Sequence, residues 1–148
     1  MNETNLRVPA VPGWFTTSDP PHLLGSRCSL CRVVAFPPRP TCPNPRCRAT
    51  AVKSTPLARQ GRIWSYTDAQ YQPPAPYISA FDPYRPFVLA AVALDEDGLI
   101  VLGQMVDGCA VEDVHVGLRV ELTVEPLVQT DACLQLMWRW RPLETVDA

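Results

Sequence analysis

The sequence predicts a mainly β protein, in which a zinc ribbon precedes a five-stranded closed barrel of the OB type. Seventeen prolines against seven glycines argue against a helical bundle, because proline breaks the interior of a helix. Four of the six cysteines form two close pairs, and five apolar segments follow residue 56 without a convincing helix. The expected units are a lead-in at 1–25, the ribbon at 26–54 and the barrel at 55–148. A split β-sandwich is the competing architecture.

The lead-in is rich in proline and surrounds one pair of aromatic residues. Its prolines stand at positions 9, 12, 20 and 21, on both sides of Trp14 and Phe15. We expect an extended segment whose two aromatic side chains pack onto another part of the protein.

The ribbon segment carries cysteines at metal-binding spacing. Cys28 and Cys31 form C-x2-C, and after ten further residues Cys42 and Cys47 form C-x4-C. Four thiolates from two such turns can converge tetrahedrally on one zinc ion. The N-terminus lacks the basic and apolar regions of a signal peptide, which favours a reducing cytoplasm and metal over two disulfides. Since the four cysteines would fill all four coordination positions of the zinc ion, we expect a structural zinc rather than a catalytic one.

The barrel segment shows the alternation of half-buried strands. Asp95 to Gly98 is a strong hairpin signal between two apolar runs. The longest apolar run has eight residues, far fewer than the roughly 18 of a membrane-spanning helix. The expected strands are 61–67, 87–94, 99–106, 114–124 and 134–141.

A long loop at 70–86 contains five prolines and several aromatic residues. Loops of this length without secondary structure are usually functional or disordered, and the apolar content favours a function. Tyr77, Phe81 and Tyr84 therefore contact either a partner and its ligand or the barrel beneath the loop.

Charge is divided unevenly along the chain. Residues 1–62 carry nine cations and two acids, a net of +7, whereas residues 63–148 carry four cations and thirteen acids, a net of −9. The basic half suits nucleic acid, the phosphates of coenzyme A or an acidic partner subunit. Arg39, Arg46 and Arg48 are the candidate arginines for such a contact.

The sequence offers no convincing catalytic constellation. Cys109 and Cys133 have no metal spacing and are expected to be buried apolar residues, and His115 lies within an expected strand. Common nucleotide-binding, hydrolase and metalloprotease motifs are missing from the sequence. The sequence therefore gives little support to a stand-alone enzyme that uses one of these three residues.

Several stretches together resemble the DUF35 family. They are LLGSRCSLCRVVAFPPRPTCPNPRC, GRIWSYT, FVLAAVALDEDGLIVLGQMV and VGLRVELTV, which lie between residues 23 and 124. The resemblance implies a rubredoxin-like zinc ribbon and an OB-fold in an accessory subunit of thiolase-like enzymes, which carry the catalytic residues themselves. Two departures are the C-x4-C spacing of the second cysteine pair and the shortened lead-in.

The family resemblance implies acyl-CoA as the substrate of the complex and a thiolase-like large subunit as the partner. Some members serve thiolases that degrade aromatic compounds, which is a role the resemblance implies here. Arg39, Tyr77, Phe81 and Tyr84 are then the expected contacts to the partner or to acyl-CoA, and no catalytic residue is expected in this chain. The alternative is a protein that binds single-stranded nucleic acid, as OB-folds and zinc ribbons also do. The acidic barrel half argues against it, because it would repel phosphates.

Overall fold

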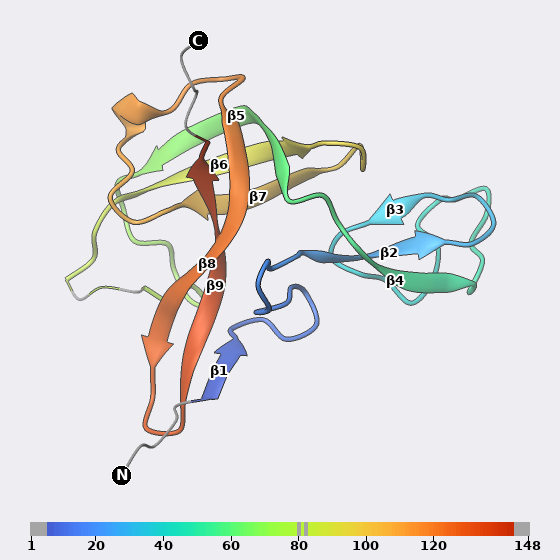
Figure 1. The fold of residues 1–148 in the computed structure, drawn as a ribbon, viewed down its shortest axis with the longest axis horizontal. Coiled ribbons are helices and arrows are strands. Elements are labelled where there is room, and N and C mark those ends of the chain that lie inside the picture. Colours follow the sequence, from blue (N-terminus) through green and yellow to red (C-terminus); the bar gives the residue numbers. More distant parts are fainter. Residues whose placement is uncertain (1–5, 80, 82, 144–148) are drawn as a thin grey trace.

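The computed structural model describes residues 6–79, 81 and 83–143, which are almost entirely strand and loop (Figure 1). No helix within these residues has the length and apolar character that crossing a membrane requires. The elements are β1 (Leu6–Pro9), β2 (Leu24–Cys28), β3 (Val34–Ala35), β4 (Val52–Pro56), β5 (Gln60–Ala69), β6 (Phe87–Leu94), β7 (Ile100–Met105), the 3-10 turn η1 (Val111–Asp113), β8 (Arg119–Gln129) and β9 (Cys133–Pro142).

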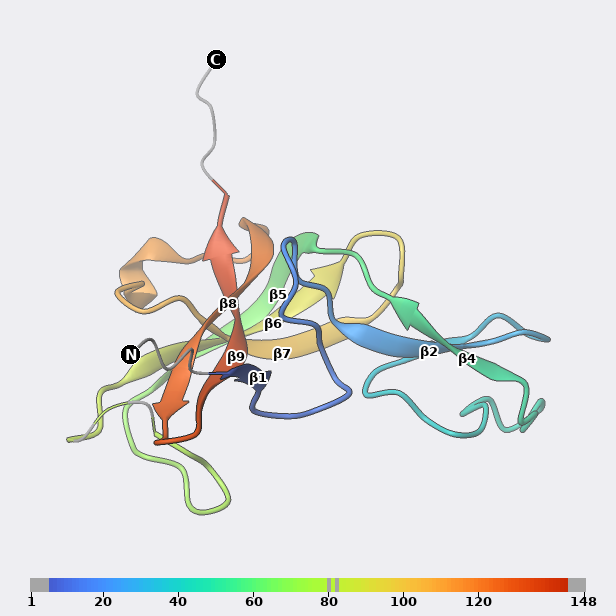
Figure 2. The ribbon, with the colours of Figure 1, turned by 60° about the horizontal axis from the view of Figure 1, so that its bottom comes forward.

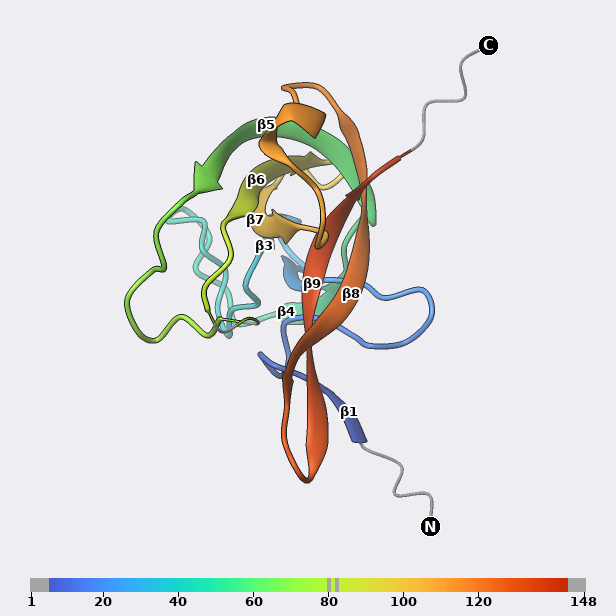
Figure 3. The same cartoon turned by 90° about the vertical axis from the view of Figure 1, so that its left-hand side faces the viewer.

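Five strands close into a barrel, which confirms the predicted architecture. The order is β5-β6-β7-β9-β8, and β8 pairs again with β5 through Gly61 and Val120. All of these pairings are antiparallel except that of β7 with β9. β1 extends the sheet by pairing in parallel with β9, as Figure 3 shows beside the long β8–β9 hairpin. Among the described residues, the short β1 is the one strand added at the outside of this closed barrel.

Side chains of one face of each strand fill the barrel. On β6 these are Val88, Ala90, Val92 and Leu94, every second residue of a strand whose eight residues are all apolar. β6 and β7 form the expected hairpin around Asp95 to Gly98. Trp140 of β9 is the largest fully buried side chain of the core. It fits because Gly103 on β7 has no Cβ; one placed there would lie 2.6 Å from the indole nitrogen of Trp140.

The prediction of a strand at 114–124 is wrong for its first five residues. Residues 114–118 are not strand; β8 begins at Arg119 and continues to Gln129. Val116, which the apolar alternation of 114–124 would place on the buried face, is 65% exposed. The reason is Gly117, whose φ of +94° turns the chain out of the extended conformation before β8 begins.

A second, three-stranded sheet has the order β3-β2-β4 and carries the four paired cysteines at one end. It projects away from the barrel in both Figure 1 and Figure 2. Few of its side chains are buried and apolar, apart from those at its junction with the barrel. The segment therefore depends on other interactions for its stability, as the sequence indicates.

An aromatic cluster joins the ribbon, the lead-in and the barrel. The rings of Trp14, Phe15 and Phe36 lie 6.3, 5.4 and 5.9 Å from Trp138 of β9, measured between ring centroids. Phe15 also forms an antiparallel bridge with Leu23. The expectation that the lead-in aromatics pack onto another part of the chain is confirmed.

Polar contacts hold the same junction. The guanidinium of Arg59 donates to the carbonyls of Pro21 (2.9 Å) and Leu122 (3.0 Å) and lies 3.8 Å from the carboxylate of Glu121. The carboxylate of Asp97, from the β6–β7 turn, accepts a hydrogen bond from the Ala58 N–H at 2.6 Å. Together with the aromatic cluster, these bonds fix the ribbon to the barrel.

Candidate metal centre and loop pocket

The four cysteines come from two turns at the end of the small sheet. Cys28 ends β2 and Cys31 lies in the turn after it, where the Arg32 N–H donates to the Cys28 carbonyl at 3.0 Å. Cys42 and Cys47 lie in the segment between β3 and β4, where the Cys47 N–H donates to the Asn44 carbonyl at 2.9 Å. The Ser29 N–H bonds to the Ala51 carbonyl at 2.8 Å and ties the two segments together.

The sulfur atoms fit a tetrahedral metal ion. All four lie within 4.8 Å of one another. Cys28 Sγ is 3.7 Å from Cys47 Sγ, and Cys31 Sγ is 3.3 Å from Cys42 Sγ. An ion bound at about 2.3 Å from each sulfur in a tetrahedron sets neighbouring sulfurs about 3.8 Å apart. The structure thus brings the four predicted cysteines together in a cluster that can hold one metal ion.

The backbone around the cluster favours thiolates at two of the positions. N–H groups of Cys31 and Leu30 lower the pKa of Cys28 to about 6, and the Val33 N–H lowers the pKa of Cys31. Burial raises the pKa of Cys42 to about 12. Because the thiolate is the form that binds metal, a bound cation would have to displace the proton of Cys42.

Tyr77 and Tyr84 fasten the 70–86 loop to the barrel. Their rings lie 5.8 and 6.1 Å from the ring of Phe87 on β6, between centroids, and 6.4 Å from each other. The Tyr84 hydroxyl donates to the Ala69 carbonyl at 2.7 Å. Both side chains are half-buried. The sequence left open whether these tyrosines contact a partner or the barrel beneath the loop. Their contacts within the chain correspond to packing against the barrel.

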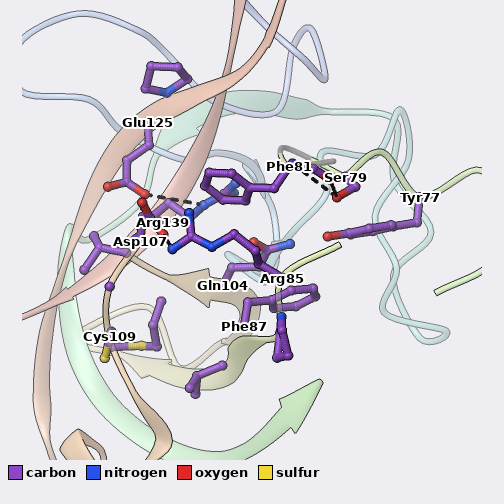
Figure 4. Close-up of a pocket in the computed structure, with 16 residues that line it drawn as sticks. Tyr77, Ser79, Phe81, Arg85, Phe87, Gln104, Asp107, Cys109, Glu125 and Arg139 are labelled. Carbon is purple, nitrogen blue, oxygen red and sulfur yellow. Dashed lines mark hydrogen bonds and ion pairs between the residues drawn. The ribbon is translucent and has the colours of Figure 1, made fainter. Parts of the chain in front are cut away.

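Phe81 differs from the two tyrosines. The residue is 39% exposed, and the guanidinium carbon of Arg85 lies 4.1 Å from the ring centroid. Figure 4 shows the ring at the side of a pocket beneath the loop. Of the three candidate aromatic residues Tyr77, Phe81 and Tyr84, Phe81 is therefore the one that a second molecule can reach most readily.

The pocket has a volume of about 60 Å³ and a charged lining. Arg139 of β9 reaches it with its side chain buried, 3.7 Å from the carboxylate of Glu125 on β8. Arg85 lies 3.4 Å from the carboxylate of Asp107, whose backbone N–H donates to the Glu125 carboxylate at 3.1 Å. Burial lowers the pKa of Arg139, while the nearby carboxylate of Glu125 acts in the opposite direction. The lining thus combines two ion pairs with the ring of Phe81.

Sequence reasoning missed Arg139. Alternation on β9 places it opposite Trp138 and Trp140, on the face expected to be solvated. In the structure all three are buried. Trp138 and Trp140 lie in the core, whereas Arg139 lines the pocket beneath the 70–86 loop, which covers the outer face of β9 at this point. No local signal reveals such a residue, since the cover comes from a segment more than 50 residues away.

The remaining candidate residues are dispersed. Arg39 is exposed on the ribbon, where its backbone N–H bonds to the Ser26 hydroxyl at 3.0 Å. Cys109 and Cys133 are half-buried rather than buried, and burial raises the pKa of Cys109. His115 is exposed, and no hydrogen bond within the described residues joins it to either thiol. The sequence expectation of two buried cysteines is therefore wrong.

Comparison with known proteins places the chain in a family. The family model described as "ChsH2, C-terminal OB-fold domain" matches residues 54–125. A "DUF35 domain-containing scaffold protein" from Methanocaldococcus jannaschii is 32% identical over 124 residues, which cover 82% of each chain. One of the same name from Pyrococcus furiosus is 28% identical over 123 residues, covering 82% of this chain and 83% of that one.

A solved structure shares the fold. The "Ltp2-ChsH2(DUF35) aldolase" contains a chain that matches 82% of this one with a TM-score of 0.60 and 29% identity, over 84% of its own length. The similarity therefore extends over both the cysteine-bearing sheet and the barrel. The chain belongs to the DUF35 family, as the sequence motifs indicate.

Proposed function

We propose that this chain is a non-catalytic accessory subunit, or scaffold, of a thiolase-like enzyme that acts on acyl-CoA thioesters. The observation that carries the proposal is the match over 82% of the chain to a DUF35 chain in an aldolase complex. The name of the archaeal relatives, scaffold protein, supports the same role. The dispersal of Cys109, Cys133 and His115 supports placing the catalytic residues in the partner.

We propose zinc as the ion of the cysteine cluster. Sulfur-only coordination is typical of structural zinc, and four protein ligands leave no position for a reactive water. Because the small sheet buries little apolar surface, zinc binding would supply much of its folding free energy. In this proposal, 26–54 is a rigid docking element, 1–25 attaches it, and 55–148 presents the 70–86 loop.

The loop and its pocket are the proposed contact with the partner and its acyl-CoA. Phe81 offers exposed aromatic surface beside Arg85, and Tyr77 and Tyr84 hold the loop in place. Arg39 is the proposed contact on the ribbon. An aromatic acyl group, as in a thiolase of aromatic-compound degradation, would match the ring of Phe81. The proposed setting is a cytoplasmic hetero-oligomer.

Reconstitution with a thiolase-like subunit tests this function. The chain is purified alone and with a candidate thiolase-like protein from the same genome, and complex formation is followed by size-exclusion chromatography. We expect no acyl-CoA cleavage or condensation by the isolated chain, and activity in the complex. A panel of aliphatic and aromatic acyl-CoA thioesters identifies the acyl group.

Two results would contradict the proposal. One is turnover by the isolated chain that Cys109→Ala or His115→Ala abolishes, which would indicate an enzyme. The other is tight binding of a single-stranded oligonucleotide in a gel shift without any affinity for the thiolase-like subunit. Phe81→Ser should raise the apparent KM of the complex, whereas Tyr71→Ser, at an exposed loop tyrosine outside the pocket lining, is the matched control.

A further inference from the structure

The ribbon carries cations without partners. Residues 24–56 include no acidic residue and six basic ones: Arg27, Arg32, Arg39, Arg46, Arg48 and Lys53. Within the part of the chain that the structure describes, none of these six side chains forms a hydrogen bond or an ion pair. In contrast, five arginines between residues 59 and 141 each pair with a carboxylate. The ribbon cations therefore remain available to a second molecule.

Two of these arginines stand where the backbone favours glycine. Arg32 directly follows Cys31 and Arg48 directly follows Cys47, with φ values of +67° and +51°. Glycine adopts this left-handed conformation at the lowest cost, whereas any residue with a Cβ is strained there. Both side chains are exposed, so packing does not account for the choice of arginine. Strain retained at two equivalent positions points to a use for the side chains.

An exposed aliphatic residue lies between the two cysteines of the first pair, Cys28 and Cys31. Leu30 precedes Cys31 in the first turn and is 72% exposed. Because the sulfurs of Cys31 and Cys47 lie within 4.8 Å of each other, the residues next to these cysteines belong to one end of the ribbon. We call Leu30, Arg32 and Arg48 the ribbon tip. It combines one apolar side chain with two strained, unpaired cations.

We propose that the ribbon tip docks onto an acidic face of the thiolase-like partner, with Leu30 in an apolar depression bordered by carboxylates. This inference rests on the proposed function and specifies where the partner is held. Guanidinium groups form paired hydrogen bonds with carboxylates, which gives geometric specificity as well as attraction. An apolar anchor inside a polar rim is the usual arrangement of a protein interface.

The tip suits a protein better than a nucleic acid. Single-stranded nucleic acids bind to aromatic platforms on which bases stack. The only aromatic residue of 24–56 is Phe36, and its ring packs between Trp14 and Trp138 rather than at the tip. Leu30 offers no stacking surface. The acidic half of the chain would further oppose a polyanion.

The test uses a variant in which strain and charge are removed together. Arg32→Gly/Arg48→Gly removes both cations and supplies the residue that this backbone prefers. We expect its thermal midpoint to equal or exceed that of the wild type. Its affinity for the thiolase-like subunit, measured by isothermal titration at low salt, should fall at least about tenfold, and added salt should reduce the difference. Leu30→Ser should weaken binding at both salt concentrations.

The control removes the same charge elsewhere. Arg7→Ala/Arg62→Ala eliminates two exposed cations outside the ribbon and should leave the affinity unchanged. Equal affinity of the Arg32/Arg48 variant and the wild type, or equal loss in the control, would overturn the inference and leave the scaffold function intact. A lowered thermal midpoint of the glycine variant would also overturn it, because the arginines would then be structural.

Two other occupants are separate outcomes of the same experiment. Tip-dependent binding of a single-stranded oligonucleotide would assign the tip to nucleic acid, and tip-dependent self-association in light scattering would assign it to a second copy of this chain. Either result would overturn the inference. If the wild-type chain itself fails to bind the thiolase-like subunit, the proposed function fails and the inference fails with it.

Discussion

Tyr84 provides a test of how the 70–86 loop is held. Its hydroxyl donates to the Ala69 carbonyl at 2.7 Å, and its ring contacts Phe87 and Tyr77 at centroid distances of 6.1 and 6.4 Å. Burial raises the pKa of this tyrosine, so the hydroxyl remains a donor at neutral pH. The loop is therefore attached by one hydrogen bond and two ring contacts.

The magnitudes follow from these contacts. Tyr84→Phe removes only the hydrogen bond and should lower the free energy of unfolding by about 1 kcal/mol. Tyr84→Ala also removes two aromatic contacts, each worth about 1 kcal/mol, for a total loss of about 3 kcal/mol. For a chain of 148 residues, these losses correspond to about 3 and about 9 °C in the thermal midpoint.

Urea denaturation followed by tryptophan fluorescence measures both variants. Phe81→Ala is the matched control. Because this residue is 39% exposed, the substitution should lower the free energy of unfolding by less than about 1 kcal/mol. A Tyr84→Ala variant as stable as the wild type, or one no less stable than Phe81→Ala, would refute the conclusion that Tyr84 fastens the loop.

Three further predictions concern the metal, the core and pH. Removing metal with a chelator, or Cys42→Ser, should unfold 24–56 and leave the barrel folded; hydrogen exchange that stays protected there without metal would contradict this. Gly103→Ala should lower the free energy of unfolding by about 1–3 kcal/mol, because the new Cβ would lie 2.6 and 2.7 Å from the indole nitrogens of Trp140 and Trp138. An unchanged midpoint of urea denaturation would contradict this close packing. Hydrogen bonding to Arg119 lowers the pKa of Asp95 in the folded protein. The ionised Asp95 carboxylate therefore stabilises the fold above about pH 4, where it is also ionised in the unfolded chain. This stabilisation is lost as the pH falls toward the pKa of Asp95 in the folded protein. Asp95→Asn should therefore reduce the acid dependence of stability, and an unaltered acid dependence would show that this pair contributes nothing.

The metal site was the most predictable part of the molecule. C-x2-C and C-x4-C are local patterns, and each turn places its two sulfurs by contacts within a few residues, such as Arg32 N–H to the Cys28 carbonyl. The only non-local requirement is that β2, β3 and β4 bring the two turns together. The exposed arginines after each second cysteine are visible in the sequence, but their strained backbone is not, since φ depends on the folded turn.

The loop pocket was only partly predictable. Five prolines and several aromatic residues marked 70–86 as an unusual loop, yet the sequence left open whether these rings pack inward or face outward. Tyr77 and Tyr84 pack against Phe87 because β6 begins beneath the loop, whereas Phe81 lies beyond that contact. The distinction requires the position of the loop relative to the barrel.

The sequence by itself determined the mainly β class, the hairpin at Asp95 to Gly98, and the clustering of four cysteines, because each depends on the chemistry of neighbouring residues. Only the tertiary structure decided that β8 starts at Arg119, that Arg139 is buried, and which of Tyr77, Phe81 and Tyr84 is most accessible. The barrel closes between strands almost 60 residues apart, as in the pairing of Gly61 with Val120. Burial at such positions is set by segments remote in sequence, so no local pattern encodes it.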